Sequence, residues 1–120
     1  METQFIYNAK GGAANSLFDL AHKIISPETY QCNLCKITHG AFIENKKFRE
    51  LKEKYNITLW HIDDYEAKNS KEKLYPIIIF RNGNDVEIGR INTHEINSIR
   101  NINALEFLLK TFTNPDIKIQ

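Results

Sequence analysis

Both cysteines of the chain, Cys32 and Cys35, lie in the stretch PETYQCNLCKITHG at residues 27–40. Two cysteines separated by two residues are typical of a redox dithiol or of half a metal site, and they can also be two small buried side chains. Near the start of a helix, side chains three residues apart face the same way, and the N–H groups of the helix stabilise a thiolate. A thiolate attacks disulfides and binds metals. The spacing therefore leaves the redox, metal-binding and inert interpretations open.

Three histidines are candidates for completing a metal site with the cysteines. His22 precedes Cys32 by ten residues, and His39 follows Cys35 by four. The third, His61, ends a predicted strand. Zinc favours four sulfur and nitrogen ligands in a tetrahedral array. The metal hypothesis takes zinc as the cofactor and uses four ligands: His22, Cys32, Cys35 and His61. The redox hypothesis expects no cofactor.

His61 is also followed by two carboxylates, Asp63 and Asp64. In α/β sheets, ligands gather beyond the carboxyl ends of strands, where these three side chains are expected. An acid–base role is one hypothesis for this cluster, and a charged surface loop is the other. The loop interpretation extends over DDYEAKNSKEK at 63–73, which is expected to be mobile.

The composition indicates one globular domain over residues 1–120. Hydrophobic residues make up 42% of the chain and charged residues 26%, and the net charge is +1. These values are close to globular averages, and Lys and Arg are spread along the chain, which argues against a nucleic-acid binder. The sequence has no apolar run of membrane-spanning length and no secretory leader, so we expect a cytoplasmic protein without membrane contact. In a reducing compartment, a lone cysteine pair is more often catalytic or metal-binding than structural.

The hydrophobic spacing predicts alternating helices and strands. Apolar residues recur at three- and four-residue steps in three segments, as in helices that pack by one face. QFIYNA, ITLWHI and the apolar run 77–80 are typical of strands, and Asn82-Gly83 predicts a hairpin. The expected order is strand 4–9, helix 13–25, a helical turn through the cysteines, helix 42–55, strand 57–62, strand 77–80, strand 86–91 and helix 102–112. This order predicts an α/β sheet in two or three layers.

The stretch YPIIIFRNGNDVEIGRI…NALEFLLKTF resembles the C-terminal half of a thioredoxin. In both, a proline precedes a buried strand, and a tight hairpin, a second strand and a closing helix follow. The resemblance implies a thioredoxin-like mixed sheet with flanking helices and a C-terminal β-hairpin plus helix. It also implies that Pro76 is in the cis form, with Tyr75 before it, and that both lie near Cys32 and Cys35.

On that resemblance, Cys32 and Cys35 are the catalytic residues of a thiol–disulfide oxidoreductase. Cys32 attacks and Cys35 resolves, while Tyr75 and Pro76 form a rim that binds an extended protein substrate or a reductase. The alternatives are the zinc-binding module and an adaptor without chemistry. The stretch HKIISPETYQCNLCKITHG also resembles a small group of uncharacterised bacterial proteins with HK…SPxTYxCxLCxT, which implies no particular activity.

Overall fold

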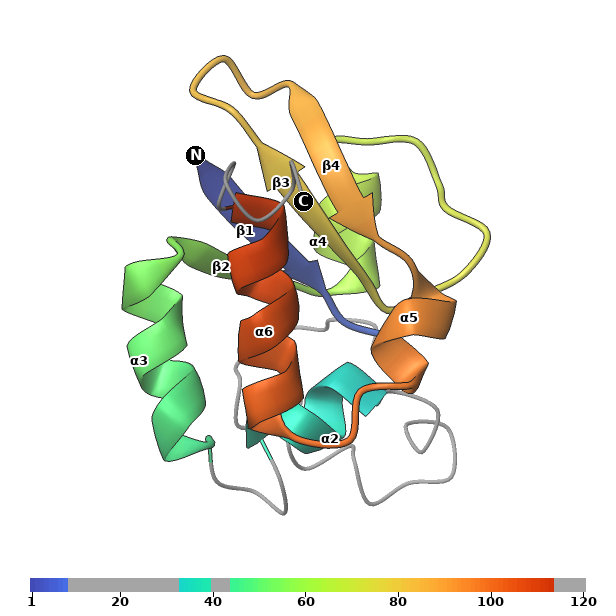
Figure 1. Cartoon of the computed structure of the whole chain (residues 1–120). Helices are drawn as coiled ribbons and strands as arrows, with labels where there is room; N and C mark the ends of the chain where they lie inside the picture. Colours follow the sequence, from blue (N-terminus) through green and yellow to red (C-terminus); the bar gives the residue numbers. More distant parts are fainter. Residues whose placement is uncertain (9–32, 40–43, 114–120) are drawn as a thin grey trace.

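A four-stranded mixed sheet forms the centre of the molecule (Figure 1). The computed structural model describes residues 1–8, 33–39 and 44–113. Its strands are β1 (Glu2–Ile6), β2 (Ile57–Trp60), β3 (Ile77–Arg81) and β4 (Glu87–Ile91), in the order β2-β1-β3-β4. β1 runs parallel to β2 and antiparallel to β3, and β3 runs antiparallel to β4. The prediction of an α/β domain with a mixed sheet and a C-terminal hairpin is confirmed.

β1 is a central strand, and it begins earlier than the sequence predicts. The aromatic run indicated a strand over 4–9, whereas the strand is Glu2–Ile6. Thr3 pairs with Ile57 on one side and with Phe80 on the other. The polar start of the strand is therefore held by two neighbours, and hydrophobicity alone does not reveal this pairing.

The hairpin predicted at Asn82-Gly83 is confirmed, although its turn is longer than two residues. Arg81 pairs with Glu87, so the turn covers residues 82–86. The side-chain oxygen of Asn82 accepts from the backbone N–H groups of Asn84 and Val86. Asp85 adopts the left-handed conformation, with a φ of 62°. The asparagine thus organises the turn through its side chain.

Two helices cover one face of the sheet, α3 (Lys46–Lys54) and α6 (Ile102–Thr113) (Figure 1). α3 was expected over 42–55. It begins at Lys46 because Asn45 is its N-cap and accepts from the N–H of Phe48. The apolar residues at three- and four-residue steps face the sheet as predicted, and the buried ones are Phe48, Leu51, Tyr55, Leu105 and Leu109. Leu108 and Phe112 are partly buried and pack against the same core. This face is the larger core.

The opposite face is covered by a short helix, α4 (Ile62–Glu66), which lies behind the sheet in Figure 1. The prediction of a mobile charged loop over 63–73 is wrong for its first part, and the strand predicted over 57–62 ends at Trp60. Tyr65 anchors the helix, since its side chain is 3% exposed and packs with Ile6, Ile77 and Ile79. One aromatic residue among many charges was too weak a signal to predict the helix.

A second short helix, α5 (Thr93–Asn97), stands in the polar stretch that follows β4. Its buried Ile96, together with Ile99, joins the larger core. α5 packs against α2 (Asn33–His39), the helix that carries Cys35. The predicted helix 13–25 lies outside the described residues. Within the described residues, no helix has the length and apolarity needed to cross a membrane.

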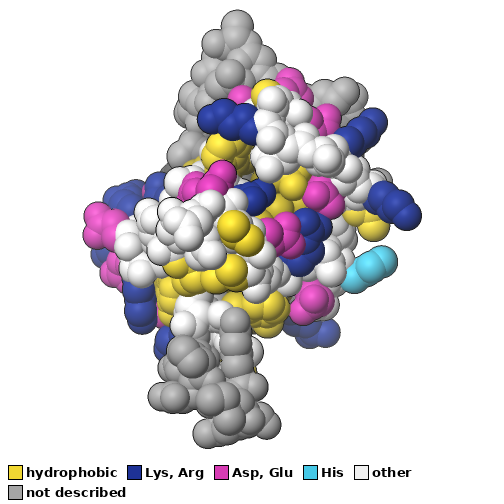
Figure 2. Space-filling view, turned by 90° about the horizontal axis from the view of Figure 1, so that it is seen from above, with side chains coloured by type: hydrophobic (Ala, Val, Ile, Leu, Met, Phe, Trp, Pro, Cys, Tyr) yellow, Lys and Arg dark blue, Asp and Glu magenta, His cyan; other side chains and the backbone are white. Residues whose placement is uncertain are grey.

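Charges of both signs cover the surface between these elements. Figure 2 shows one face, on which basic and acidic side chains are interspersed with exposed hydrophobic ones. The exposed large hydrophobic residues are Met1, Leu74, Val86, Ile88 and Phe107. On the face in Figure 2, no field of a single sign dominates.

Candidate functional site

Cys35 lies in the first turn of α2 and faces the larger core. Its side chain is 0% exposed. The residue is disulfide-bonded. Cys32, which precedes α2 in the sequence, lies outside the described residues. The described residues around Cys35 support the helix that carries it.

Asn33, the residue between the two cysteines, ties α2 to the end of α5. Its side-chain amide donates to the carbonyl of Ile96 at 2.7 Å and to the carbonyl of Ile99 at 2.8 Å. The carbonyl of Ile96 also accepts from the backbone N–H of Ile99, so the Asn33 amide adds a second hydrogen bond there and joins the end of α5 to α2. Sequence reasoning missed this role, because nothing in the spacing of an asparagine identifies such partners.

The other end of α5 is tied to the proline loop. The peptide bond between Tyr75 and Pro76 is cis, which confirms the prediction for this bond. The hydroxyl of Thr93, the first residue of α5, donates to the carbonyl of Pro76 at 2.8 Å. α5 therefore binds the Cys35 helix at one end and the loop of Pro76 at the other. This is the physical connection between the two halves of the candidate site.

Tyr75 is half-buried beside Pro76, which is buried. The hydroxyl of Tyr75 donates to Glu66 at 2.8 Å and accepts from the backbone N–H of Glu72. Its ring packs edge-on against that of Tyr65. Burial, with a smaller contribution from the carboxylate of Glu66, raises the pKa of Tyr75 to about 12, so the phenol stays neutral and donates. Tyr75 is thus held in place by the turn that surrounds it.

An ion pair fastens the same loop to β4. The guanidinium of Arg90 donates to Glu72 at 2.9 Å and to Glu87 at 2.7 Å. Glu72 also accepts from the hydroxyl of Tyr65 at 2.9 Å. The hydrogen bond from Arg90 holds the pKa of Glu72 below its usual value, which keeps this carboxylate charged. Glu72 is therefore the main polar anchor of the loop that leads to Pro76.

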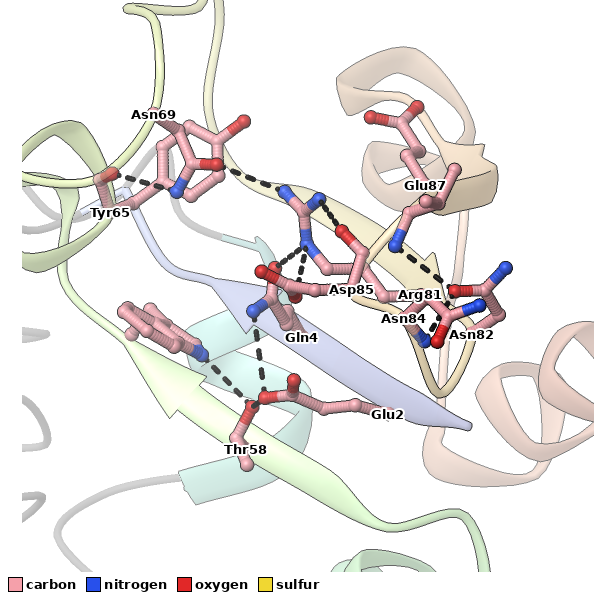
Figure 3. A network of polar contacts seen from close by, with 12 residues as sticks. Glu2, Gln4, Thr58, Tyr65, Asn69, Arg81, Asn82, Asn84, Asp85 and Glu87 are labelled. Atoms are coloured by element: carbon pink, nitrogen blue, oxygen red, sulfur yellow. Dashed lines mark hydrogen bonds and ion pairs between the residues drawn. The ribbon is translucent and has the colours of Figure 1, made fainter.

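A second polar network crosses the sheet on the side of α4 (Figure 3). Arg81 donates to the side chain of Gln4 at 2.8 Å and to that of Asn69 at 3.1 Å. Thr58 donates to Glu2 at 2.6 Å. Gln4 lies between Arg81 and Glu2. The network joins β2, β1 and β3 to the loop after α4. It explains how polar side chains are accommodated on the central strand.

A buried polar chain lies at the end of α2. The hydroxyl of Thr38 donates to the carbonyl of Leu34 at 2.9 Å. It also lies 2.9 Å from the hydroxyl of Tyr7 and 2.7 Å from Nδ1 of His39. A hydroxyl has one proton, so Tyr7 and His39 are the donors to Thr38. The neutral imidazole then carries its proton on Nδ1, and its Nε2 is left as an acceptor.

His39 is 2% exposed, and its Nε2 has no hydrogen-bond partner in the described structure. Nε2 lies 3.7 Å from a carboxylate oxygen of Glu44, which Lys52 and Arg49 also contact. Burial lowers the pKa of His39, and this effect outweighs the attraction of Glu44. The imidazole is therefore neutral at pH 7. From the sequence, His39 was a candidate metal ligand. In the structure it lies in the core beside Tyr7 and Phe48.

His61 and Asp64 form the start of α4. Asp64 accepts from the backbone N–H of His61 at 3.3 Å, and its oxygen lies 3.1 Å from Nδ1 of the same histidine. The contact from the Asp64 side chain back to the N–H of the N-cap residue His61 is one half of a capping box. His61 is 7% exposed, whereas Asp63 is exposed. The three residues of the acid–base hypothesis are thus neighbours in the chain. Two of them, His61 and Asp64, have a structural role at the start of α4.

Of the proposed zinc ligands, Cys35 and His61 are described, whereas His22 and Cys32 lie outside the described residues. Cys35 belongs to α2 and His61 to the junction of β2 and α4. Within the described ranges, no group of three or more potential ligands converges on one point. What the structure does bring together is α2, α5 and the loop of Tyr75 and Pro76. Comparisons with models of protein families, with curated proteins and with solved structures find no match to the chain.

Proposed function

We propose that the protein is a thioredoxin-like thiol–disulfide oxidoreductase that uses Cys32 and Cys35. The observation that carries the proposal is the disulfide bond of Cys35, in a chain whose two cysteines are spaced as Cys-x-x-Cys. A disulfide at such a spacing is the oxidised form of a dithiol that can exchange with other disulfides. No cofactor is needed for this reaction, because the sulfur atoms themselves carry the electrons.

The architecture supports the proposal through the features that the thioredoxin resemblance implies. The peptide bond before Pro76 is cis, and a strand buried on both faces, Ile77–Arg81, follows it. An antiparallel hairpin leads to β4, and α6 closes the chain. The connection through α5 places the loop of Pro76 and the helix of Cys35 on one support.

The burial of Cys35 indicates which of the two sulfurs attacks the substrate and which one resolves the mixed disulfide. A side chain that is 0% exposed cannot meet a protein substrate first, so Cys32 is the attacking residue. The Cys32 thiolate attacks one sulfur of the substrate disulfide, that bond breaks, and the first substrate sulfur leaves as a thiolate. Cys35 then loses its proton to solvent and attacks the sulfur of Cys32, which releases the second substrate thiolate. Two electrons pass to the substrate, and the protein ends oxidised.

The test is turnover of a disulfide-linked model peptide with glutathione as the final reductant. The wild-type protein should accelerate the reduction, and Cys32→Ser should abolish the acceleration. In a separate reaction without glutathione, Cys35→Ser should form a stable mixed disulfide between Cys32 and the peptide, visible as a mass increase, because no second thiol is present to resolve it. His61→Gln is the control: it removes a zinc ligand of the alternative hypothesis and should leave turnover unchanged.

Zinc content, measured on protein purified without chelator, separates the two hypotheses. The redox proposal expects less than one zinc for every ten chains. About one zinc per chain that is lost in His61→Gln, together with an absence of turnover, would overturn the oxidoreductase proposal in favour of the metal module.

A further inference from the structure

A hollow of about 490 Å³ lies beside the loop of Tyr75 and Pro76, between that loop and the start of α5. Its lining combines basic and apolar side chains, which include Lys71, Lys73, Leu74, Ile77, Arg90 and His94. Thr93, which binds the carbonyl of Pro76, also lines it. The hollow is therefore built on the same support as the candidate site.

The charges around the hollow are unbalanced. Glu72 is the acidic residue of the lining, and its carboxylate is already bound by Arg90 and by the hydroxyl of Tyr65. Because Glu72 points into this network, its neighbours Lys71 and Lys73 are exposed to solvent. Neither lysine forms an ion pair with any residue of the described ranges. Two cationic groups thus face the opening without a counter-charge.

An apolar surface accompanies these charges. Leu74 follows Lys73 directly and is 54% exposed, whereas Ile77 is buried at 2% and forms part of the wall. Leu74 and Ile77 line the same hollow, so together they give it an apolar side that an aliphatic group can contact. A ligand that uses both features carries an aliphatic group and a negative charge.

The hollow lies a short distance from the cysteine helix. Thr93 at its edge and Ile96, which accepts from Asn33, are three residues apart on α5, which corresponds to about 4.5 Å along the helix axis. Adding the reach of the Asn33 side chain gives a separation on the order of 10 Å between the hollow and Asn33, the residue that follows Cys32 in the sequence. An extended chain covers about 3.3 Å per residue. A bound peptide would therefore reach the hollow with a residue about three positions from its own cysteine.

We propose that the hollow selects protein substrates with an acidic side chain about three residues from the disulfide cysteine, flanked by an aliphatic residue. This inference rests on the proposed oxidoreductase function and specifies its substrate class. Lys71 and Lys73 attract the carboxylate, and Leu74 contacts the aliphatic side chain. These lysines determine specificity and take no part in sulfur chemistry.

The experiment measures second-order rate constants for reduced protein with three disulfide-linked peptides. The peptides are identical except for Asp, Asn or Lys at three positions from the cysteine, placed before it in one series and after it in another. In one of the two series, we expect the Asp peptide to react about three- to tenfold faster than the Asn peptide, and the Lys peptide to be slowest. The preference should shrink at 0.5 M salt, because screening acts on exposed charges.

The double variant Lys71→Gln/Lys73→Gln should lose the preference for Asp and keep the rate for the Asn peptide. The matched control is Lys46→Gln/Lys54→Gln, which removes two exposed lysines from α3 and should keep the preference. Equal rates for all three peptides in both series would overturn the substrate proposal and leave the oxidoreductase function standing.

If no peptide reacts, the oxidoreductase proposal fails, and the hollow is tested by itself. A peptide with Ser in place of Cys is added to the oxidised protein, and amide chemical shifts are followed. Shifts of the amides at 71–75, 77 and 92–94 with the Asp peptide, and not with the Lys peptide, would support an acidic ligand. The absence of such shifts would overturn it.

Discussion

The two faces of the sheet are held by different forces. On the face covered by α3 and α6, fifteen buried residues of the described chain form one cluster, which includes Cys35. On the face covered by α4, the corresponding cluster contains four residues. The rest of that second face is held by hydrogen bonds and ion pairs that involve Arg81, Arg90 and Glu72.

This difference indicates that one face mainly provides stability and the other mainly positions a loop. Burial of apolar area dominates folding energetics, so the first face supplies most of the stability and fixes the helix of Cys35. Partly exposed ion pairs contribute little to stability, but they fix geometry. The second face therefore positions the loop of Tyr75 and Pro76 at small energetic gain. Substitutions on the two faces should have effects of different size and kind.

The largest effect is expected for Phe5→Ala on the first face. Phe5 is 0% exposed on the central strand, and its ring lies 5.6 Å from that of Phe48. Removal of a buried aromatic ring costs about 3–5 kcal/mol in the free energy of unfolding. Urea denaturation measures this loss in the free energy of unfolding. Phe107→Ala, at a side chain that is 57% exposed, is the control and should change stability by about 0.5 kcal/mol or less. Similar values for the two variants would contradict the assignment of the core.

A smaller loss of stability is expected for Asn33→Ala, which removes the hydrogen bonds between α2 and the end of α5. The two hydrogen bonds from the Asn33 amide are lost, although the carbonyl of Ile96 keeps the backbone N–H of Ile99 as a partner. The expected cost is about 1–3 kcal/mol. Asn103→Ala, at an exposed position of α6, serves as the matched control and should be neutral or slightly stabilising. A neutral Asn33→Ala would show that α5 does not support the cysteine helix.

The pH dependence of stability tests the buried His39. Burial lowers its folded pKa below the ordinary value of 6.5, so in mildly acidic solution the unfolded chain binds more protons than the folded one. Stability should therefore fall as the pH drops below about 6.5 and be unaffected above pH 7. His39→Gln should flatten this slope. Glu44, whose folded pKa is lowered, contributes a separate loss below about pH 4.5. A slope between pH 6.5 and 5 that survives His39→Gln would contradict the role of this imidazole.

The smallest effect on global stability is expected for Glu72→Gln on the second face. Glu72 and Arg90 are partly exposed, so the change should cost about 1 kcal/mol or less. It should nevertheless speed hydrogen exchange of the amides at 67–75, because the loop loses its anchor. Glu87→Gln is the control, since Glu87 also binds Arg90 but does not hold the loop. Equal exchange rates in the two variants would refute the anchoring role.

The sequence predicts the first face well. The spacing of Phe48, Leu51 and Tyr55 reports burial on this face, because the helix period decides which side chains face the core. The apolar run Ile77–Phe80 reports a strand that is buried on both faces, with Ile78 and Phe80 in the larger core and Ile77 and Ile79 in the smaller one. The Asn82-Gly83 signal locates the hairpin, whereas the cis bond at Pro76 was expected from the resemblance to thioredoxins. These features depend on neighbours in the chain.

The second face and the polar part of the site are not predictable in this way. α4 depends on Tyr65 meeting Ile6 and Ile79, and the anchor of the loop depends on Glu72 meeting Arg90. The amide of Asn33 meets carbonyls more than sixty positions away in the chain. Such pairs arise from the tertiary arrangement, and a single sequence contains no period or motif that reports them.

The most direct test of the central claim is a redox titration of the wild-type protein in glutathione buffers, with alkylation and mass spectrometry as the readout. If Cys32 and Cys35 cycle as a dithiol and a disulfide, the chain should pass between a doubly alkylated form and an unalkylated form. The transition should fit two electrons, a tenfold change in the equilibrium per about 30 mV, and be the same in both directions. A persistent singly alkylated or glutathione-bound form, or two thiols that never oxidise, would contradict the account.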